Sequence, residues 1–162
     1  MGSGKTTFGR LLSEKLNLLH LDTDLEIEKI KNMKVNEIFS LYGEKYFREL
    51  EQDTIIRIIK NNKKSVLSLG GGSFLNVNIK EYVKKNCISI WLNVNLNIIY
   101  DRLNKSNIIR PLFSNIHNKN DLEALFNKRN LIYKEADIKL NIENLSKKEV
   151  IQELLSKIGK FN

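Results

Sequence analysis

The first seven residues constrain this chain more than any other stretch, because they form the second half of a phosphate-binding loop. The full pattern is G-x-x-x-x-G-K-[ST]; Gly4-Lys5-Thr6 supply its end, and its first glycine would precede Met1. Apolar residues then follow at helical spacing, at positions 8, 11, 12 and 16. In such a loop, backbone N–H groups and a helix N-terminus cradle phosphates. The sequence therefore predicts nucleoside triphosphate binding; the alternative is a disordered glycine-rich terminus beside an ordinary helix.

Length and composition favour one cytoplasmic domain. With 162 residues, of which 41% are hydrophobic and 28% charged, the chain is long enough for a single hydrophobic core. No apolar run approaches the roughly 20 residues of a transmembrane helix, and the single cysteine, Cys87, is typical of a reducing compartment. The net charge is +8, but the lysines are scattered and form no basic run or aromatic-interleaved patch. We therefore expect a monomer with neither nucleic acid nor a membrane as partner.

Strand-like and helix-like segments alternate, which predicts an α/β fold with a parallel sheet. The expected helices cover about 5–16, 24–31, 35–41, 44–60, 77–85, 95–103, 121–135 and 147–158, and the expected strands about 18–22, 65–69, 87–93 and 137–142. Residues 108–120 are polar and irregular and contain Pro111, the only proline, so we expect a loop that acts as a lid.

Several motifs together resemble one family, the shikimate kinases, in spacing and order over essentially the whole chain. These motifs are Gly2 to Thr7, Leu21 to Glu28, Ile38-Phe39 with Gly43-Glu44, Phe47 to Glu51, Leu69 to Gly72, Arg110 to Leu112, and Arg129 followed by Tyr133. The resemblance implies a single domain over residues 1–162, a P-loop kinase built as a three-layer sandwich. It also implies Mg²⁺-assisted transfer of the γ-phosphoryl group of ATP to the 3-hydroxyl of shikimate, a step toward chorismate and the aromatic amino acids. The acceptor would bind at about residues 24–60, beside a lid at about 108–120.

For ATP, the resemblance assigns the loop residues Gly2, Ser3, Gly4, Lys5, Thr6 and Thr7. Lys5 would neutralise the β- and γ-phosphates, and Thr6 and Asp22 would hold Mg²⁺, Asp22 through a water molecule. Arg110 would swing onto the phosphates as the lid closes, so that Lys5, Asp24 and Arg110 are the expected catalytic residues. The alternatives are an Asx-turn or helix cap at the two aspartates and an exposed loop arginine at position 110.

For shikimate, the resemblance assigns Asp24, Arg48, Gly70, Gly71, Gly72 and Arg129. Asp24 would hold hydroxyl groups, as a general base or only as a positioner, and the two arginines would bind the carboxylate. The three glycines would let the backbone approach the ligand, with Gly71 as the main contact. Only six arginines occur against 21 lysines, which makes each arginine a candidate for binding carboxylate or phosphate through its planar fork. The alternatives are an ion pair of Arg48 with Glu51 at helical spacing and a solvated helix face at Arg129.

The chain departs from the family pattern at its start. The family fold has a five-stranded sheet of order 2-3-1-4-5, in which the central first strand precedes the phosphate loop. That strand would precede Met1, so we expect strands 3 and 4 to flank an empty slot and the natural start to lie roughly ten residues upstream. Three alternative functions stay open: another small-molecule kinase such as a gluconate kinase, a non-catalytic P-loop domain that binds nucleotide or nucleic acid, and an inactive truncated fragment.

Overall fold

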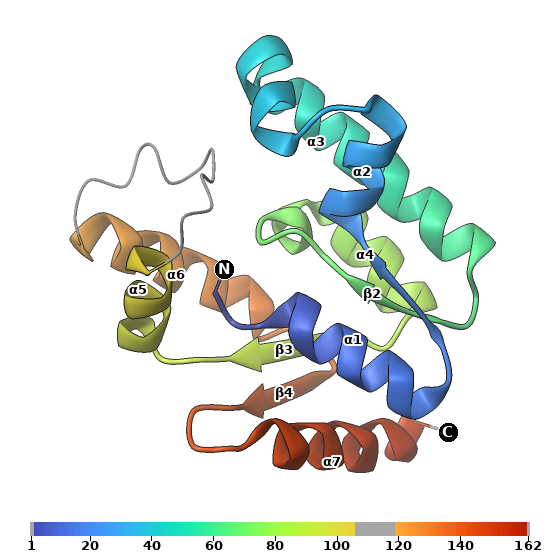
Figure 1. Ribbon diagram of the computed structural model, residues 1–162, viewed down its shortest axis with the longest axis vertical. Helices are drawn as coiled ribbons and strands as arrows, with labels where there is room; N and C mark the ends of the chain where they lie inside the picture. The colour runs from blue at the N-terminus through green and yellow to red at the C-terminus, as the bar shows by residue number, and fades with distance from the viewer. Residues whose placement is uncertain (1, 106–118, 162) are drawn as a thin grey trace.

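The computed structural model describes residues 2–105 and 119–161, in which strands alternate with helices (Figure 1). The helices are α1 (Lys5–Leu16), α2 (Thr23–Lys31), α3 (Val35–Asn61), α4 (Val77–Asn86), α5 (Leu96–Asn104), α6 (Lys119–Tyr133) and α7 (Lys147–Ile158). The strands are β1 (Leu19–Asp22), β2 (Ser65–Ser68), β3 (Ile90–Asn93) and β4 (Ile138–Asn141). The described residues also contain the single-turn 3₁₀ helices η1 (Ser73–Leu75) and η3 (Gly159–Phe161). The predicted alternation of helices and strands is confirmed.

Two predicted boundaries are corrected. The two helices expected on either side of Gly43 form one kinked helix, α3, in which Gly43 has φ 79° and ψ 172°, a conformation that glycine adopts far more readily than other residues. Helix α6 begins at Lys119, two residues before the helix expected at about 121–135. Most of the predicted lid, about 108–120, lies outside the described residues together with Arg110, so the lid stays a prediction.

In the described part of the chain, the strands form two parallel pairs. β1 pairs with β2, with Asp22 opposite Ser68, and β3 pairs with β4, with Asn93 opposite Asn141. No ladder between described residues joins β2 to β3. Instead a cavity of about 920 Å³ lies between them. β2 and β3 correspond to strands 3 and 4 of the family order, so the expectation that these two strands flank an empty slot is confirmed.

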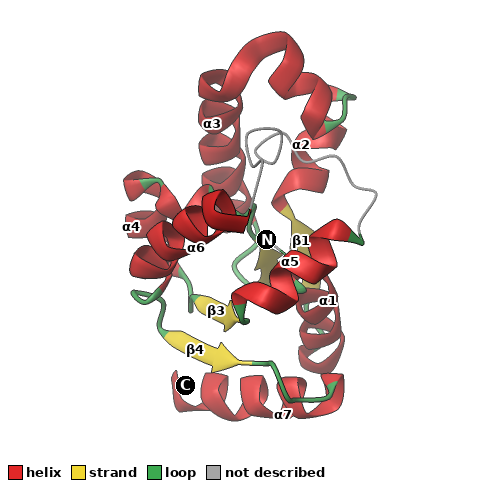
Figure 2. Ribbon diagram, turned by 90° about the vertical axis from the view of Figure 1, so that its left-hand side faces the viewer, coloured by secondary structure: helices red, strands yellow, loops and turns green. Residues whose placement is uncertain are grey.

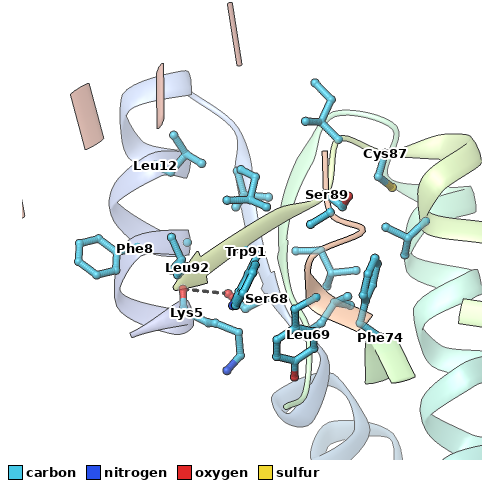
Figure 3. A pocket seen from close by; sticks show the side chains of 18 of the residues that line it. Lys5, Phe8, Leu12, Ser68, Leu69, Phe74, Cys87, Ser89, Trp91 and Leu92 are labelled. Carbon is cyan, nitrogen blue, oxygen red and sulfur yellow. Dashed lines mark hydrogen bonds between the residues drawn. The ribbon is translucent and has the colours of Figure 1, made fainter. Parts of the chain in front are cut away.

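Apolar side chains line this cavity from three elements. Val66 of β2 and Leu92 of β3 contribute from the facing strands, and Phe8 and Leu12 contribute from α1. Figure 3 shows the α1 residues on one side of the cavity, with Trp91 and Phe74 toward the other. The lining is therefore chemically similar to a protein core.

Helices cover both faces of the strands and give the predicted three layers (Figure 2). α1 packs against β1, β2 and α7, whereas α4 and α6 lie on the opposite side of the strands. The largest core cluster joins α1, β4 and α7 through buried side chains such as Leu12, Leu140 and Leu154. Among the described residues, no helix is both long and apolar enough to cross a membrane.

α2 and the first part of α3 form a lobe beyond the carboxyl ends of β1 and β2 (Figure 1). The lobe has its own small core of Ile27, Ile38 and Phe47. Glu28 ties its two helices together, because it accepts from the Val35 N–H over 3.1 Å and from Lys34 Nζ over 2.8 Å. This lobe contains most of the region in which the sequence predicts acceptor binding.

Candidate active site

The phosphate-loop residues turn sharply into the N-terminus of α1. Gly2 and Gly4 have φ angles of 62° and 85°, in the left-handed region that favours glycine, and Gly4 is the N-cap of α1. The first turn of α1 contains no acidic residue. The partial positive charge of the helix end therefore adds to the charge of Lys5, and together they favour an anion at this position.

Contacts from two other elements hold this loop in place. Arg102 of α5 donates from Nη1 to the Gly2 carbonyl over 2.9 Å. Ser68, at the end of β2, donates from Oγ to the Lys5 carbonyl over 3.3 Å (Figure 3). Ser3 is buried, whereas Thr6 and Thr7, at the start of α1, are exposed. The loop is thus fixed on its protein side and open where a nucleotide would approach.

Thr6 and Asp22 meet beside the loop. Thr6 Oγ1 donates to Asp22 Oδ2 over 2.8 Å. The other carboxylate oxygen of Asp22 accepts from the Asp24 N–H over 3.1 Å and so caps α2. The alternative that Asp22 caps a helix is therefore correct. The same carboxylate also contacts the hydroxyl of Thr6, the other residue predicted to hold Mg²⁺.

The oxygens of Thr6 and Asp22 suit a magnesium ion bound together with a nucleotide. Mg²⁺ prefers oxygen ligands, keeps several waters, and uses one or two carboxylates plus substrate phosphates. Within residues 2–105 and 119–161, no cluster of three or more His, Cys, Asp or Glu could hold a metal ion. The hydroxyl and the carboxylate beside the phosphate loop fit Mg²⁺ bound together with a nucleotide.

On the acceptor side, a buried carboxylate organises the neighbouring groups. Glu51 is 1% exposed and accepts from Arg48 Nη1 and from Ser73 Oγ, each over 2.7 Å. Arg48 also donates to Glu44 Oε1 from Nε and Nη2, each over 3.2 Å. The alternative pairing of Arg48 with Glu51 is therefore real, and it fixes the guanidinium rather than leaving it in solvent.

The glycines after β2 let the backbone pass close to these charged side chains. A Cβ atom at Gly70 would lie 2.6 Å from Glu51 Oε1 and 3.1 Å from Asp24 Oδ1. A Cβ atom at Gly72 would lie 3.0 Å from Arg48 Nη2. The carboxylates of Asp24 and Glu51 and the guanidinium of Arg48 therefore all lie against the short backbone stretch of the glycine loop.

Arg129 of α6 is buried with part of its guanidinium unpaired. The residue is 5% exposed, and its Nε and Nη1 have no hydrogen-bond partner among the described residues. Burial lowers the pKa of Arg129; nearby Tyr133 and Glu51 act against this, and Arg48 lowers the pKa further. The alternative of a solvated helix face is wrong here. Because an unpaired buried charge is unfavourable, this guanidinium points to an anionic ligand.

The predicted residues come together in two adjacent groups. The first contains Gly2, Ser3, Gly4, Lys5, Thr6, Thr7 and Asp22, and the second contains Asp24, Arg48, Gly70, Gly71, Gly72 and Arg129. The cap between Asp22 and Asp24 joins the two groups. Arg110 lies outside the described residues, so its predicted position is not part of this geometry.

Three partners of these residues were not predicted to be functional. Glu51 appears in the sequence only as a possible ion-pair partner, and Ser73 gives no signal beyond following the glycines. The Tyr133 hydroxyl donates to the Gly71 carbonyl over 2.5 Å. Helical spacing could have identified two of them as neighbours of site residues. Glu51 lies three residues after Arg48, and Tyr133 lies four residues after Arg129, so each shares a helix face with an arginine.

Comparison with known protein families decides which kind of P-loop protein this is. The family described as shikimate kinase matches residues 1–159. The chain belongs to the shikimate kinase family. The predicted family is thereby confirmed, and with it an ATP-dependent phosphotransferase as the class of enzyme.

Curated shikimate kinases resemble the chain over nearly its whole length. The shikimate kinase of Sulfurihydrogenibium sp. is 41% identical over 158 residues, which cover 98% of this chain and 93% of that relative. The shikimate kinase of Rhizobium meliloti is 35% identical over 159 residues, which cover 98% of this chain and 82% of that relative.

Solved shikimate kinase structures share the fold. The enzyme from Aquifex aeolicus has a TM-score of 0.86 at 31% identity and covers 98% of this chain and 92% of its own. The enzyme from Acinetobacter baumannii, solved in complex with shikimate, has a TM-score of 0.87 at 28% identity and covers 100% of this chain and 90% of its own. These likenesses confirm the predicted P-loop kinase fold.

Proposed function

We propose that this chain transfers the γ-phosphoryl group of ATP to the 3-hydroxyl of shikimate, giving 3-phosphoshikimate and ADP. The observation that carries the proposal is the buried guanidinium of Arg129, whose Nε and Nη1 lack a partner among the described residues. A planar guanidinium matches a carboxylate through paired hydrogen bonds, and shikimate is a small carboxylate with three hydroxyl groups. The names of the curated relatives agree with this acceptor.

On the donor side, the phosphates of ATP would bind the phosphate loop and the start of α1. Lys5 and the loop N–H groups would contact the β- and γ-phosphates, and Thr6, with Asp22 through water, would hold Mg²⁺. The ion, when bound, neutralises charge on the phosphates. Phosphoryl transfer depends mainly on positioning and charge stabilisation, so the fixed loop and helix dipole are suited to it. Arg110 would complete the phosphate contacts from the lid.

On the acceptor side, Arg48 and Arg129 would bind the carboxylate, and the glycine loop and Asp24 would hold the hydroxyl groups. Asp24 lies beside Gly70, and its backbone N–H donates to the carboxylate of Asp22. Both contacts support placing Asp24 between the two substrates. We propose that Asp24 accepts the hydrogen bond of the attacking hydroxyl and takes its proton as the new P–O bond forms. The role is testable through the pH dependence of kcat.

We further propose that the enzyme acts as a cytoplasmic monomer in the route to chorismate, without nucleic acid or membrane partners. The scattered lysines, which form no basic patch, support this reading. Of the three open alternatives, the comparisons favour neither a gluconate kinase nor an inactive fragment.

The test is ADP release from ATP and Mg²⁺ with shikimate, with gluconate and without an acceptor. The chain should be assayed as it stands and with an apolar strand of about ten residues added at its N-terminus. Turnover that depends on shikimate in either protein supports the proposal. Turnover with gluconate alone would assign another acceptor. Salt-sensitive polynucleotide binding without acceptor-dependent ADP release would favour a binding domain.

A further inference from the structure

The phenol of Tyr133 closes a contact between α6 and the glycine loop that none of the proposed roles explains. Its hydroxyl donates to the Gly71 carbonyl over 2.5 Å, at the short end of the range for O–H···O hydrogen bonds. Its ring packs against Phe74 and Trp91, with centroid distances of 6.4 and 6.0 Å. Burial raises the pKa of Tyr133, so the hydroxyl stays a proton donor at neutral pH.

This contact fixes the orientation of one peptide plane. In a trans peptide, the carbonyl of one residue and the N–H of the next point in opposite directions, and the described residues contain no cis peptide. Because the Gly71 carbonyl points at Tyr133, the Gly72 N–H points away from Tyr133. The Gly70 carbonyl accepts from the Ser73 N–H over 3.2 Å, while the Ser73 hydroxyl donates its proton to Glu51 Oε1, the nearer acceptor. The contact with the Ser73 N–H turns the Gly71 N–H away from Ser73 in the same manner.

The two amides are available to a ligand. Among the described residues, neither the Gly71 N–H nor the Gly72 N–H donates a hydrogen bond. A Cβ atom at Gly72 would lie 3.0 Å from Arg48 Nη2, so this backbone runs beside the arginine that we assign to the carboxylate. Two oriented N–H donors next to a guanidinium form a suitable surface for carboxylate or hydroxyl oxygens.

Three consecutive glycines need such a restraint. Glycine has the greatest backbone freedom of all residues, and a glycine run loses much entropy when it is ordered. Tyr133 lies one helical turn after Arg129 on α6, so the helix that carries the arginine also carries the group that holds the loop. The hydrogen bond therefore connects the glycine loop to the helix that carries Arg129.

We propose that Tyr133 is a positioning residue that aims the Gly71 and Gly72 amides at the acceptor substrate and keeps them in register with Arg129. The inference rests on the proposed function, because it takes the acceptor to be the ligand of Arg129. In this proposal Tyr133 acts through the glycine loop and not by contact with a substrate.

The test is Tyr133→Phe, which keeps the ring and its packing and removes only the hydroxyl. The KM for shikimate should rise about 5- to 30-fold, because one to two kcal/mol of hydrogen-bond energy is lost, while the KM for ATP changes less than about twofold. Tyr82→Phe is the matched control, because Tyr82 lies on α4, outside the region expected to bind the acceptor, and it should leave both KM values unchanged. A parallel rise in both KM values, together with a fall in Tm, would instead indicate a purely structural role and overturn the proposal.

A second readout does not depend on activity. In ligand-free protein, ¹⁵N relaxation of the Gly71 and Gly72 amides should change from rigid in the wild type to mobile in Tyr133→Phe, with order parameters falling from about 0.85 to below about 0.6. Unchanged order parameters would overturn the proposal. If the wild type shows no shikimate-dependent turnover, the proposed function fails, and this measurement still decides whether Tyr133 orders the loop.

Discussion

Replacing Arg129 with methionine should make the ligand-free protein more stable while it weakens substrate binding. The Nε and Nη1 atoms of Arg129 are buried without a partner among the described residues, and each such donor costs about 1–3 kcal/mol. Methionine keeps an apolar stem that fills the same space, and replacing buried ionic groups with apolar ones stabilises by about 1–4 kcal/mol in known cases. Glu51 keeps its partners Arg48 and Ser73 in the variant, so no new unpaired charge is created.

We therefore expect the free energy of unfolding to rise by about 1–3 kcal/mol, and Tm by about 2–10 °C for a domain of this size. Urea and thermal unfolding without ligand would measure this, with the exposed Arg57→Met as a control that should change stability by less than about 0.5 kcal/mol. The KM for shikimate should rise about 10- to 150-fold, since charge-assisted hydrogen bonds contribute about 1.5–3 kcal/mol. Shikimate should also raise the Tm of the wild type but not of Arg129→Met.

One result would refute this reasoning. If Arg129→Met is less stable than the wild type without ligand, the arginine contributes to the fold through its own contacts. Its burial would then be structural, and the argument that the unpaired guanidinium marks a ligand position would fail even if activity is lost as well.

Three further predictions concern the loop, acid stability and the cavity. Gly70→Ala should lower the free energy of unfolding by about 1–3 kcal/mol in urea, because its Cβ would lie 2.6 Å from Glu51 Oε1; an unchanged transition would mean that the loop can shift. Burial alone would raise the pKa of Asp137, but hydrogen bonds from the side chain and backbone of Ser89 lower it overall. The ionised Asp137 carboxylate therefore stabilises the fold above about pH 3.9, and this contribution is lost as the pH falls through its lower folded pKa. The stability gap between wild type and Ser89→Ala should therefore narrow between about pH 5 and pH 2, and a pH-independent gap would contradict this. A segment of about six apolar residues fused ahead of Gly2 should enter the 920 Å³ cavity as a strand, raise Tm and protect β2 and β3 amides from exchange, whereas the same segment with a central proline should do neither.

The alternation of elements was predictable because strands covered on both faces are nearly continuous apolar runs. The strand ends were less predictable. The apolar run from Cys87 suggested a strand over 87–93, but β3 begins at Ile90. The Cys87 N–H still bonds to the Val83 carbonyl at the end of α4, and Ser89 binds the Asp137 carboxylate. Tertiary partners, which the run itself does not specify, therefore decide where the ladder starts.

The scarcity of arginine was a useful but incomplete guide to the site. Arg48, Arg102 and Arg129 do lie at the loops and glycines described above. Arg10, however, pairs with Glu14 on the surface and Arg57 is exposed. Residue type therefore selected the candidate arginines, whereas burial distinguishes those at the site from those on the surface. The burial of Arg129 depends on how α6 packs against α5 and η1. No pattern within the sequence of α6 contains that information.

The acceptor side holds one buried guanidinium whose donors are incompletely satisfied. Arg48 and Arg129 repel each other, and Arg48 lowers the pKa of Arg129. Arg48 is paired with Glu51 and Glu44, whereas Nε and Nη1 of Arg129 have no hydrogen-bond partner among the described residues. One carboxylate would supply acceptors for these two nitrogens, which is the condition under which buried ions are tolerated. A neutral polyol would bring no compensating charge to Arg129, so the pairing of Arg48 and the burial of Arg129 together favour an acid as the ligand.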